Sequence, residues 1–454
     1  MTLSPRITSN PAGTPLRPAR DIGGVTASAS DAESSATAPR MSASANVRGA
    51  LIMGGSLGAV AVARSLGRRG IPVCFLSHDH PIASFSRYVR RTITWPGPAS
   101  PDALAILLEI IREQQMEGWV LFVCGDHELR FASQNYARLA SVLRLTCPPW
   151  EIARWAYDKH LTYQRAAEIG VNVPWSYHPR DIDDVARLDC RFPVILKPTV
   201  REQQNAFTLA KAWRIDDRTA LISRYQEAAA LVGENNIVLQ ELIPGGGQQQ
   251  FSFSAVCKNG VPLASLVARR TRQYPIDFGY TSTFVESIDA PDVESAGRRM
   301  VQAMQLTGLV EVEFKRDPRD GRLKLLDINA RPWTWIGLGS LAGVDFPWLA
   351  WQLACEQNVA PVTGRPGVAW IHTPRDLAAA AHEILANRLS LIGYLRSFRW
   401  PVTFAAFAKD DPLPACFELP LVAWRVLSRR MPSWLARPRR AAHGHSKRPE
   451  TNYS

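Results

Sequence analysis

Residues 308–331 read GLVEVEFKRDPRDGRLKLLDINAR, two runs of alternating apolar and polar side chains that flank a short polar segment. Alternation with a period of two is typical of a β-strand with one buried face. The Asp-Pro and Asp-Gly pairs within Asp317–Gly321 are turn signals. The segment therefore predicts a hairpin in which strand Val310–Arg316 pairs with strand Arg322–Ile328.

Polar side chains gather on one face of this predicted hairpin. Because side chains alternate along a strand, Glu311 and Glu313 share a face, and so do Asp327, Asn329 and Arg331. Carboxylate and amide oxygens suit Mg²⁺, and an arginine beside them can neutralise charge on phosphate oxygens. We expect Glu313, Asp327 and Asn329 to hold magnesium, whereas Glu311 taken alone is better explained as a solvated strand residue.

Outside this hairpin the chain predicts a mixture of α/β and α+β structure. Gly49–Met53, a glycine-containing turn, a helical pattern and Pro72–Ser77 follow one another, which predicts a parallel sheet covered by helices. Strands predominate after residue 150. They are predicted at Val194–Lys197, Ile237–Leu242, Phe251–Lys258 and Leu263–Arg270.

Composition suggests where the domains begin and end. Residues 1–47 are rich in Ser, Ala, Thr, Pro and Gly and show no apolar periodicity, so we interpret them as disordered. Met41 is an alternative translation start. The first domain is expected at 48–150 and the second at 151–375. A helical extension with a basic tail is expected at 376–454.

Two lysines and a glycine run lie before the hairpin. Lys159 follows Asp158 at a predicted helix start, and Lys197 ends the apolar strand Phe192–Leu196. A lysine that emerges from a buried strand is costly unless an anion meets it, and phosphate is an obvious candidate. The segment Val238–Pro244, followed by three glycines, predicts a hinge whose backbone could read an adenine edge.

Taken in order, these features resemble the ATP-grasp superfamily of carboxylate–amine ligases, with the nearest likeness to its D-aspartate ligase-like branch. The resemblance extends over about Gly49 to Gln357. Five motifs carry it: Asp158-Lys159 with Ile169–Pro174, Pro193–Pro198, Leu239–Ile243, Gly308–Phe314 and Leu326–Pro332. It implies a Rossmann-like pre-ATP-grasp domain followed by a two-subdomain ATP-grasp fold. It also implies ATP and Mg²⁺ as cofactors and an ADP-forming reaction that joins a small carboxylate to an amine.

The resemblance implies ATP-binding roles for six residues. These are Lys159 and Lys197 on the phosphates, Gln240, Glu241 and Leu242 in the adenine hinge, and Gln250 where the family usually has a ribose-binding glutamate. The loop after Lys197 has no glycine, so backbone cradling of phosphate is not expected there. Arg201 is a substitute for that loop, and Lys211 is a further candidate.

The resemblance also assigns the hairpin. Glu313, Asp327 and Asn329 match the magnesium ligands, although the family usually has Glu at position 327, and Arg331 matches the arginine that stabilises the acyl-phosphate and tetrahedral intermediate.

Substrate recognition rests on residues outside those motifs. Arg269, Arg270 and Arg272 lie close together on a predicted strand, and we expect Arg270 and Arg272 to serve catalysis by holding a carboxylate or acyl-phosphate. Asp126, with His127, follows a buried strand and could hold an amine. A helix-capping role is the alternative for both.

Two alternative functions stay open. Gly54, Gly55 and Gly58 follow a strand, as in an NAD-dependent oxidoreductase, but Ser56 stands at the second glycine position of that fingerprint. A degenerate ATP-grasp protein that binds nucleotide without ligating would fit Gln250 and the glycine-free loop.

Composition excludes several classes of protein. The chain of 454 residues is 46% hydrophobic and 21% charged, as in ordinary globular proteins, and no apolar run approaches the ~18–20 residues that span a bilayer. Its seven cysteines form no Cys-x-x-Cys pair, which argues against a disulfide framework or structural zinc and favours a cytoplasmic location.

Most of the net positive charge of the chain lies near its C-terminus. The chain carries +12, and Leu421–Ser454 holds eight basic residues and one acidic residue, so no specific nucleic-acid partner is expected for the body. A final docking helix with a solvated basic end is the simplest interpretation of this segment. Peripheral contact with an anionic membrane is its alternative, and a homodimer is left open.

Overall fold

The computed structural model describes residues 48–199, 205–210, 212–274, 281–399 and 401–430. Val47–Ser454 forms one compact unit. The predictions about residues 1–47, Arg201, Lys211 and the tail beyond Arg430 lie outside the described residues. The boundaries expected at residues 150 and 375 stay predictions.

A parallel sheet opens the described chain, with strand order β3-β2-β1-β4-β5. Its strands are β1 (Ala50–Met53), β2 (Val73–Ser77), β3 (Val89–Thr94), β4 (Val120–Val123) and β5 (Arg144–Leu145). The helical elements of this region are α1 (Leu57–Gly67), η1 (Pro81–Phe85), α2 (Ala103–Glu113), α3 (Asp126–Gln134) and α4 (Tyr136–Ala140). All four residues of β1 and of β4 are buried, as expected for parallel strands covered on both faces.

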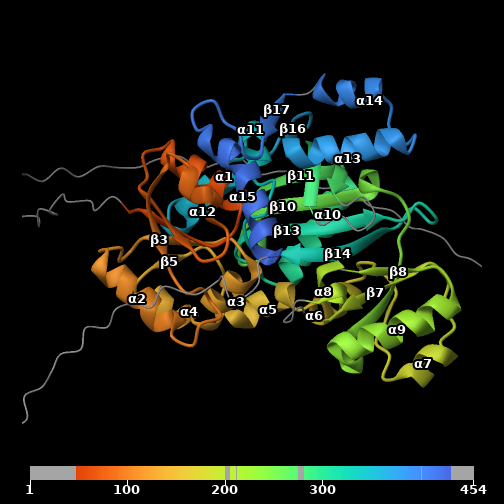
Figure 1. Ribbon diagram of the computed structural model, residues 1–454. Helices are drawn as coiled ribbons and strands as arrows, with labels where there is room; N and C mark the ends of the chain where they lie inside the picture. The colour runs from red at the N-terminus through yellow and green to blue at the C-terminus, as the bar shows by residue number, and fades with distance from the viewer. Residues whose placement is uncertain (1–47, 200–204, 211, 275–280, 400, 431–454) are drawn as a thin grey trace, which may run out of the picture. The chain divides into compact units, whose positions relative to one another are not determined.

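Two helices and a small antiparallel sheet follow. Helix α5 (Trp150–Tyr157) leads into α6 (Lys159–Glu168), whose N-terminus is capped by the Asp158 carboxylate. The sheet has the order β6-β9-β7-β8, with β6 (Ser176–Tyr177), β7 (Val194–Pro198), β8 (Trp213–Ile215) and β9 (Ile237–Glu241). Helices α7 (Ile182–Arg187), α8 (Ala206–Ala210) and α9 (Arg218–Val232) belong to this layer, together with η2 (Glu234–Asn236) (Figure 1).

An eight-stranded sheet carries the predicted hairpin. Its main order is β14-β13-β10-β11-β12-β16-β17, and β15 pairs with β11. The strands are β10 (Gln250–Lys258), β11 (Val261–Tyr274), β12 (Thr281–Ser287), β13 (Gly308–Arg316), β14 (Leu323–Asn329), β15 (Val362–Thr363), β16 (Ala369–Ile371) and β17 (Val402–Phe404). Helical elements of the same region are η3 (Gly247–Gln249), α10 (Pro291–Ala303), α11 (Leu338–Ala342) and α12 (Phe346–Ala354).

The C-terminal extension contains α13 (Thr373–Leu385), α14 (Leu391–Arg396), η4 (Ser397–Arg399) and α15 (Leu413–Arg430). It was expected to hold only helices and loops after Asp376. That expectation is wrong in one respect, because β17 pairs in parallel with β16 and extends the large sheet. None of the helices in the described ranges is long and apolar enough to cross a membrane.

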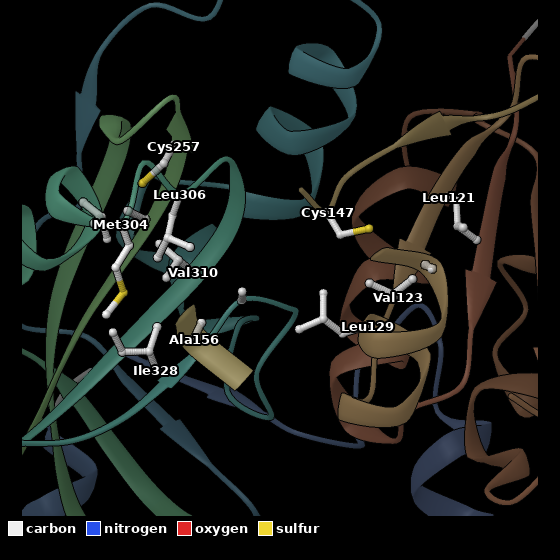
Figure 2. Packing of buried hydrophobic residues seen from close by; sticks show 14 of the residues in the cluster. Leu121, Val123, Leu129, Cys147, Ala156, Cys257, Met304, Leu306, Val310 and Ile328 are labelled. Atoms are coloured by element: carbon white, nitrogen blue, oxygen red, sulfur yellow. The ribbon is translucent and has the colours of Figure 1, made fainter. Parts of the chain in front are cut away.

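One buried cluster joins the parallel sheet to the large sheet. It includes Leu121 and Val123 of β4, Ala156 of α5, Val310 of β13 and Ile328 of β14 (Figure 2). The hairpin strands therefore sit on a continuous apolar core, which leaves their opposite face for polar side chains.

Candidate functional site

The predicted hairpin is present and brings its acidic residues together. Glu311 pairs with Asn329 and Glu313 with Asp327 in the register of β13 and β14. Asn329 Nδ2 donates hydrogen bonds to Glu311 Oε2 at 3.1 Å and to Glu313 Oε1 at 3.0 Å. The three side chains therefore lie on one face, as the alternation of the sequence predicted.

Glu311 is buried, so its interpretation as a solvated strand residue is wrong. The physical reason is that β13 lies inside the sheet, between β10 and β14. Ser252 of β10 donates to Glu311 Oε1 at 2.9 Å, and only 2% of Glu311 is exposed. Burial, with a further contribution from Glu313, raises the pKa of Glu311 to about 7.

Each predicted metal-binding carboxylate is neutralised by a cation. Lys159 Nζ lies 2.7 Å from Asp327 Oδ2. Partial desolvation acts to lower the pKa of Lys159, whose side chain is 52% exposed, but the Asp327 carboxylate outweighs it and the pKa is raised. Arg270 of β11 forms an ion pair with Glu313 and donates to Ser282 Oγ at 2.5 Å.

Arg331 joins the hairpin to the parallel sheet. Its Nη2 atom donates to Asn329 Oδ1 at 3.1 Å and to Asp126 Oδ2 at 2.9 Å. Asp126 begins α3 at the carboxyl end of β4, where open α/β sheets bind ligands. Partial desolvation would raise the pKa of Asp126, whose side chain is 58% exposed, yet the Arg331 guanidinium holds the pKa below its ordinary value. In this state Asp126 binds Arg331, not an amine.

Lys197 reaches the hairpin through a chain of hydrogen bonds. Its Nζ atom donates to Gln240 Oε1 at 2.6 Å. Gln240 Nε2 donates to the Tyr163 hydroxyl at 3.2 Å and to Ser176 Oγ at 3.0 Å. The Tyr163 hydroxyl in turn donates to the carbonyl oxygen of Leu326, the residue before Asp327, at 3.2 Å. Tyr163 was not singled out from the sequence, because one tyrosine on a helix carries no motif.

Glu241 and Leu242 stand at the end of β9. The Glu241 carboxylate lies 2.6 Å from Lys324 Nζ and 2.7 Å from Arg319 Nη2, so its side chain ties the small sheet to the hairpin. The backbone N–H of Leu242 donates to the Pro193 carbonyl at 3.3 Å. Their role in reading adenine stays a prediction.

Two polar groups next to the acidic cluster have no hydrogen-bond or ion-pair partner among the described residues. Lys315 lies on the face of β13 that carries Glu311 and Glu313, opposite Gln250 of β10. No hydrogen bond or ion pair to Lys315 Nζ is present within the described ranges, and burial lowers the pKa of this lysine to about 8. Gln250 Oε1 is buried and unpaired there as well. The period-two pattern contained this signal, since Lys315 continues the face of the two glutamates.

The other two arginines of the predicted substrate group lie elsewhere. Arg272 forms a bidentate pair with Asp376, at 2.9 and 2.8 Å, and stacks on Phe284. Register irregularities in β11 between Arg269 and Arg272 break the expected alternation. Arg269 pairs with Glu286 at 3.1 Å. We therefore leave Arg272 out of the proposed site and keep Arg270.

The glycine turn of the parallel sheet is filled by the protein itself. A Cβ at Gly54 or at Gly125 would collide with the carboxylate of Glu128, which is 4% exposed. A Cβ at Gly58 would lie 3.0 Å from the Trp333 carbonyl oxygen. A buried carboxylate in this position disfavours a second anion such as a pyrophosphate, which weakens the oxidoreductase alternative.

The donor set suits a magnesium ion that is shared with phosphate. In the described part of the chain no group of three or more His, Cys, Asp or Glu side chains could hold a metal by itself. Glu313, Asp327 and Asn329 supply two carboxylates and an amide, all hard oxygen donors on one sheet face. Mg²⁺ in nucleotide sites takes one or two carboxylates and completes its shell with phosphate oxygens and water.

Comparisons with known proteins agree with this architecture. Residues 235–374 match a family model described as ATP-grasp in the biosynthetic pathway with Ter operon. No curated protein sequence gives a significant match. A biotin carboxylase from Campylobacter jejuni aligns with a TM-score of 0.54 and 13% identity, covering 70% of this chain and 74% of that one.

Two further solved structures share the fold. An L-amino acid ligase from Bacillus licheniformis has a TM-score of 0.50 and 17% identity over 69% of this chain and 77% of its own. A phosphoribosylglycinamide synthetase from Anaerococcus prevotii has a TM-score of 0.51 and 13% identity over 68% and 76%. The matched segment contains the whole acidic cluster with Arg270 and Arg331, and these solved structures show that the chain shares their fold.

Proposed function

We propose that this protein is an ATP- and Mg²⁺-dependent ligase that activates a carboxylate as an acyl-phosphate and joins it to an amine, releasing ADP and phosphate. One observation carries the proposal. Glu313, Asp327 and Asn329 share a face with Arg331 beside them, and Lys159 and the hydrogen-bonded chain from Lys197 approach that face. The family description, which places its members in a biosynthetic pathway, supports a synthetic reaction.

We assign the roles of the residues in this cluster according to their charge. Lys159 and Lys197 would bind phosphate oxygens, since the Lys159 ammonium group pairs with Asp327 and the Lys197 ammonium group is linked to the hairpin through Gln240 and Tyr163. Glu313, Asp327 and Asn329 would hold Mg²⁺, which when bound disperses negative charge on the phosphates. Arg270, now paired with Glu313, is placed to bind the substrate carboxylate or the transferred phosphoryl group.

The reaction has two displacements. The substrate carboxylate oxygen bonds to the γ-phosphorus while the bond to ADP breaks, and the amine nitrogen then bonds to the acyl carbon while phosphate leaves. Arg331, fixed by Asn329, would stabilise the oxyanion of the second step. Asp126 already accepts hydrogen bonds from Arg331 and could take up the amine proton. Closure of the small sheet over ATP would exclude water from the acyl-phosphate.

ADP release tests this proposal directly. Purified protein is incubated with magnesium and ATP and with panels of carboxylates and amines, and ADP is measured for the wild type and for Arg331→Ala and Glu313→Ala. We expect release with a matching pair of substrates and a loss of about 100-fold or more in either variant. The matched control is Arg365→Ala, which should retain activity, because this exposed arginine side chain donates a hydrogen bond to the Leu341 carbonyl, outside the acidic cluster.

The same measurements distinguish a ligase from a protein that binds ATP without ligating. Release that survives fully in both variants would contradict the assigned roles. ATP binding by calorimetry without ADP release for any pair in the panel would favour a degenerate protein that binds nucleotide only.

A further inference from the structure

Glu311 is a buried carboxylate to which the proposed reaction assigns no role. It lies inside the large sheet, in register with Ser254 of β10 on one side and with Asn329 of β14 on the other. Only 2% of Glu311 is exposed, although it shares a strand face with the proposed magnesium ligand Glu313. Burying a carboxylate is costly, so the hydrogen bonds that compensate for it indicate what Glu311 does.

Both carboxylate oxygens of Glu311 accept hydrogen bonds from neutral groups. Ser252 Oγ donates to Oε1 at 2.9 Å, and Asn329 Nδ2 donates to Oε2 at 3.1 Å. Glu313 and Asp327 each form an ion pair, whereas Glu311 forms none with a described residue. The contacts of Glu311 are therefore directed at a serine and at the Asn329 amide.

The hydrogen bonds of Asn329 allow one orientation of its amide. Its Nδ2 atom faces two carboxylate oxygens, Glu311 Oε2 at 3.1 Å and Glu313 Oε1 at 3.0 Å. Its Oδ1 atom accepts from Arg331 Nη2 at 3.1 Å, and a guanidinium group can only donate. Turning the amide over would place its oxygen against two carboxylates and its NH₂ group against the guanidinium. The position of Asn329 Oδ1 is thus fixed from both ends of the amide.

This orientation matters for the proposed metal site. Asn329 has a single side-chain oxygen, and magnesium binds oxygen atoms. The same oxygen contacts Arg331, which is proposed to stabilise the oxyanion. In metal sites, loss of a hydrogen-bond partner that orients a ligand typically costs about 10- to 100-fold in metal affinity.

We propose that Glu311 is a positioning residue that acts through Asn329, holding its amide so that Oδ1 is available to Mg²⁺ and to Arg331. Ser252 in turn fixes the Glu311 carboxylate from β10. This role rests on the proposed function, because that function supplies the metal. Glu311 performs it by accepting hydrogen bonds, and its negative charge is not required.

Two substitutions of similar size separate hydrogen bonding from charge. In Glu311→Gln, the side-chain oxygen can accept from Asn329 Nδ2 and the NH₂ group can donate to Ser252, because a hydroxyl both donates and accepts. In Glu311→Met, the thioether is only a weak acceptor. Both variants remove the charge, and only the second removes the hydrogen bond that holds the amide.

Titration calorimetry with ADP, in excess magnesium and in EDTA, tests the proposal on the full-length protein. The ratio of the two affinities reports the contribution of the metal. We expect Glu311→Met to lower ADP affinity in magnesium by about tenfold or more and to leave affinity in EDTA unchanged. Glu311→Gln should bind ADP as the wild type does in both conditions. Melting temperatures in EDTA show whether each variant is folded.

Two serines of β10 supply a second, independent pair of variants. Ser252→Ala removes the other hydrogen bond of Glu311 and should lower magnesium-dependent ADP affinity to a smaller extent than Glu311→Met. The matched control is Ser254→Ala, since the Ser254 hydroxyl is also buried but has no hydrogen-bond partner in the part of the chain that the structure describes. It should bind ADP as the wild type does. Equal affinities of the two serine variants would contradict the proposal even if Glu311→Met failed to fold.

The remaining outcomes are equally decisive. Wild-type affinity in folded Glu311→Met would overturn the positioning role. Equal losses in Glu311→Gln and Glu311→Met would also overturn it, because the charge of Glu311 would then be what matters. Failure of the proposed function has a different signature, namely wild-type protein whose ADP binding does not depend on magnesium, and that result would remove the metal site together with the role of Glu311.

Discussion

Replacing Asp411 by alanine should destabilise the protein strongly. The Asp411 carboxylate is fully buried, and it accepts hydrogen bonds from Arg64 Nε at 2.9 Å, Ser86 Oγ at 2.7 Å and the Arg87 backbone N–H at 2.8 Å. Arg64 comes from α1 of the parallel sheet, so this pair fastens the C-terminal extension to the first part of the described chain.

The magnitude follows from burial. Removing Asp411 leaves the Arg64 guanidinium, only 7% exposed, without its counter-charge, and an uncompensated buried charge costs about 3–5 kcal/mol. Burial already lowers the pKa of Arg64, which reflects the same desolvation. The neighbouring Asp410 pairs with Arg68 at 2.8 Å, but both side chains are more than 40% exposed. Asp410→Ala should therefore cost only about 1 kcal/mol.

Urea unfolding, followed by circular dichroism, gives the free energy of unfolding of the wild type and the two variants. We expect the midpoint of Asp411→Ala to fall far below that of Asp410→Ala. Limited proteolysis should also cut the C-terminal extension faster in Asp411→Ala. Equal losses in the two variants, or a loss below about 1 kcal/mol for Asp411→Ala, would refute the argument from burial.

Three further predictions concern the site. Gln240→Leu removes one hydrogen-bond acceptor of Lys197, so ATP affinity, measured by calorimetry, should fall about tenfold or more, and an unchanged affinity would contradict a role for this chain of hydrogen bonds. Lys315→Met removes a cation without a protein partner in the described ranges. It should weaken ATP binding without lowering the melting temperature, and the opposite pattern would indicate a structural role. Glu311 has a pKa raised from 4.5 to about 7, so its contribution to stability is fully present below about pH 4.5 and is lost as the pH rises through 7. Without metal, the melting temperature of Glu311→Gln minus that of the wild type should therefore increase from pH 5 to pH 8. A difference in melting temperature that does not change with pH would contradict this assignment.

The hairpin and its polar face could be predicted from the sequence alone. The side-chain period of two and the Asp-Gly turn determine which residues share a face, so Glu313 and Asn329 were expected together before any contact was known. The parallel sheet was also predictable, because a buried apolar run, a turn and a helix recur in order. The hairpin and the order of strands and helices depend on residues that are close together in the sequence, so the local pattern of apolar, polar and turn residues specifies them.

Other properties depended on tertiary structure. Arg270 and Arg272 lie on one strand, but irregular pairing in β11 turns one toward Glu313 and the other toward Asp376. The position of β13 inside its sheet buries Glu311. The pair between Asp126 and Arg331 joins residues 205 positions apart. Burial and long-range pairing arise only when distant segments pack against each other, and no periodicity along the chain encodes which neighbour a given charge will meet.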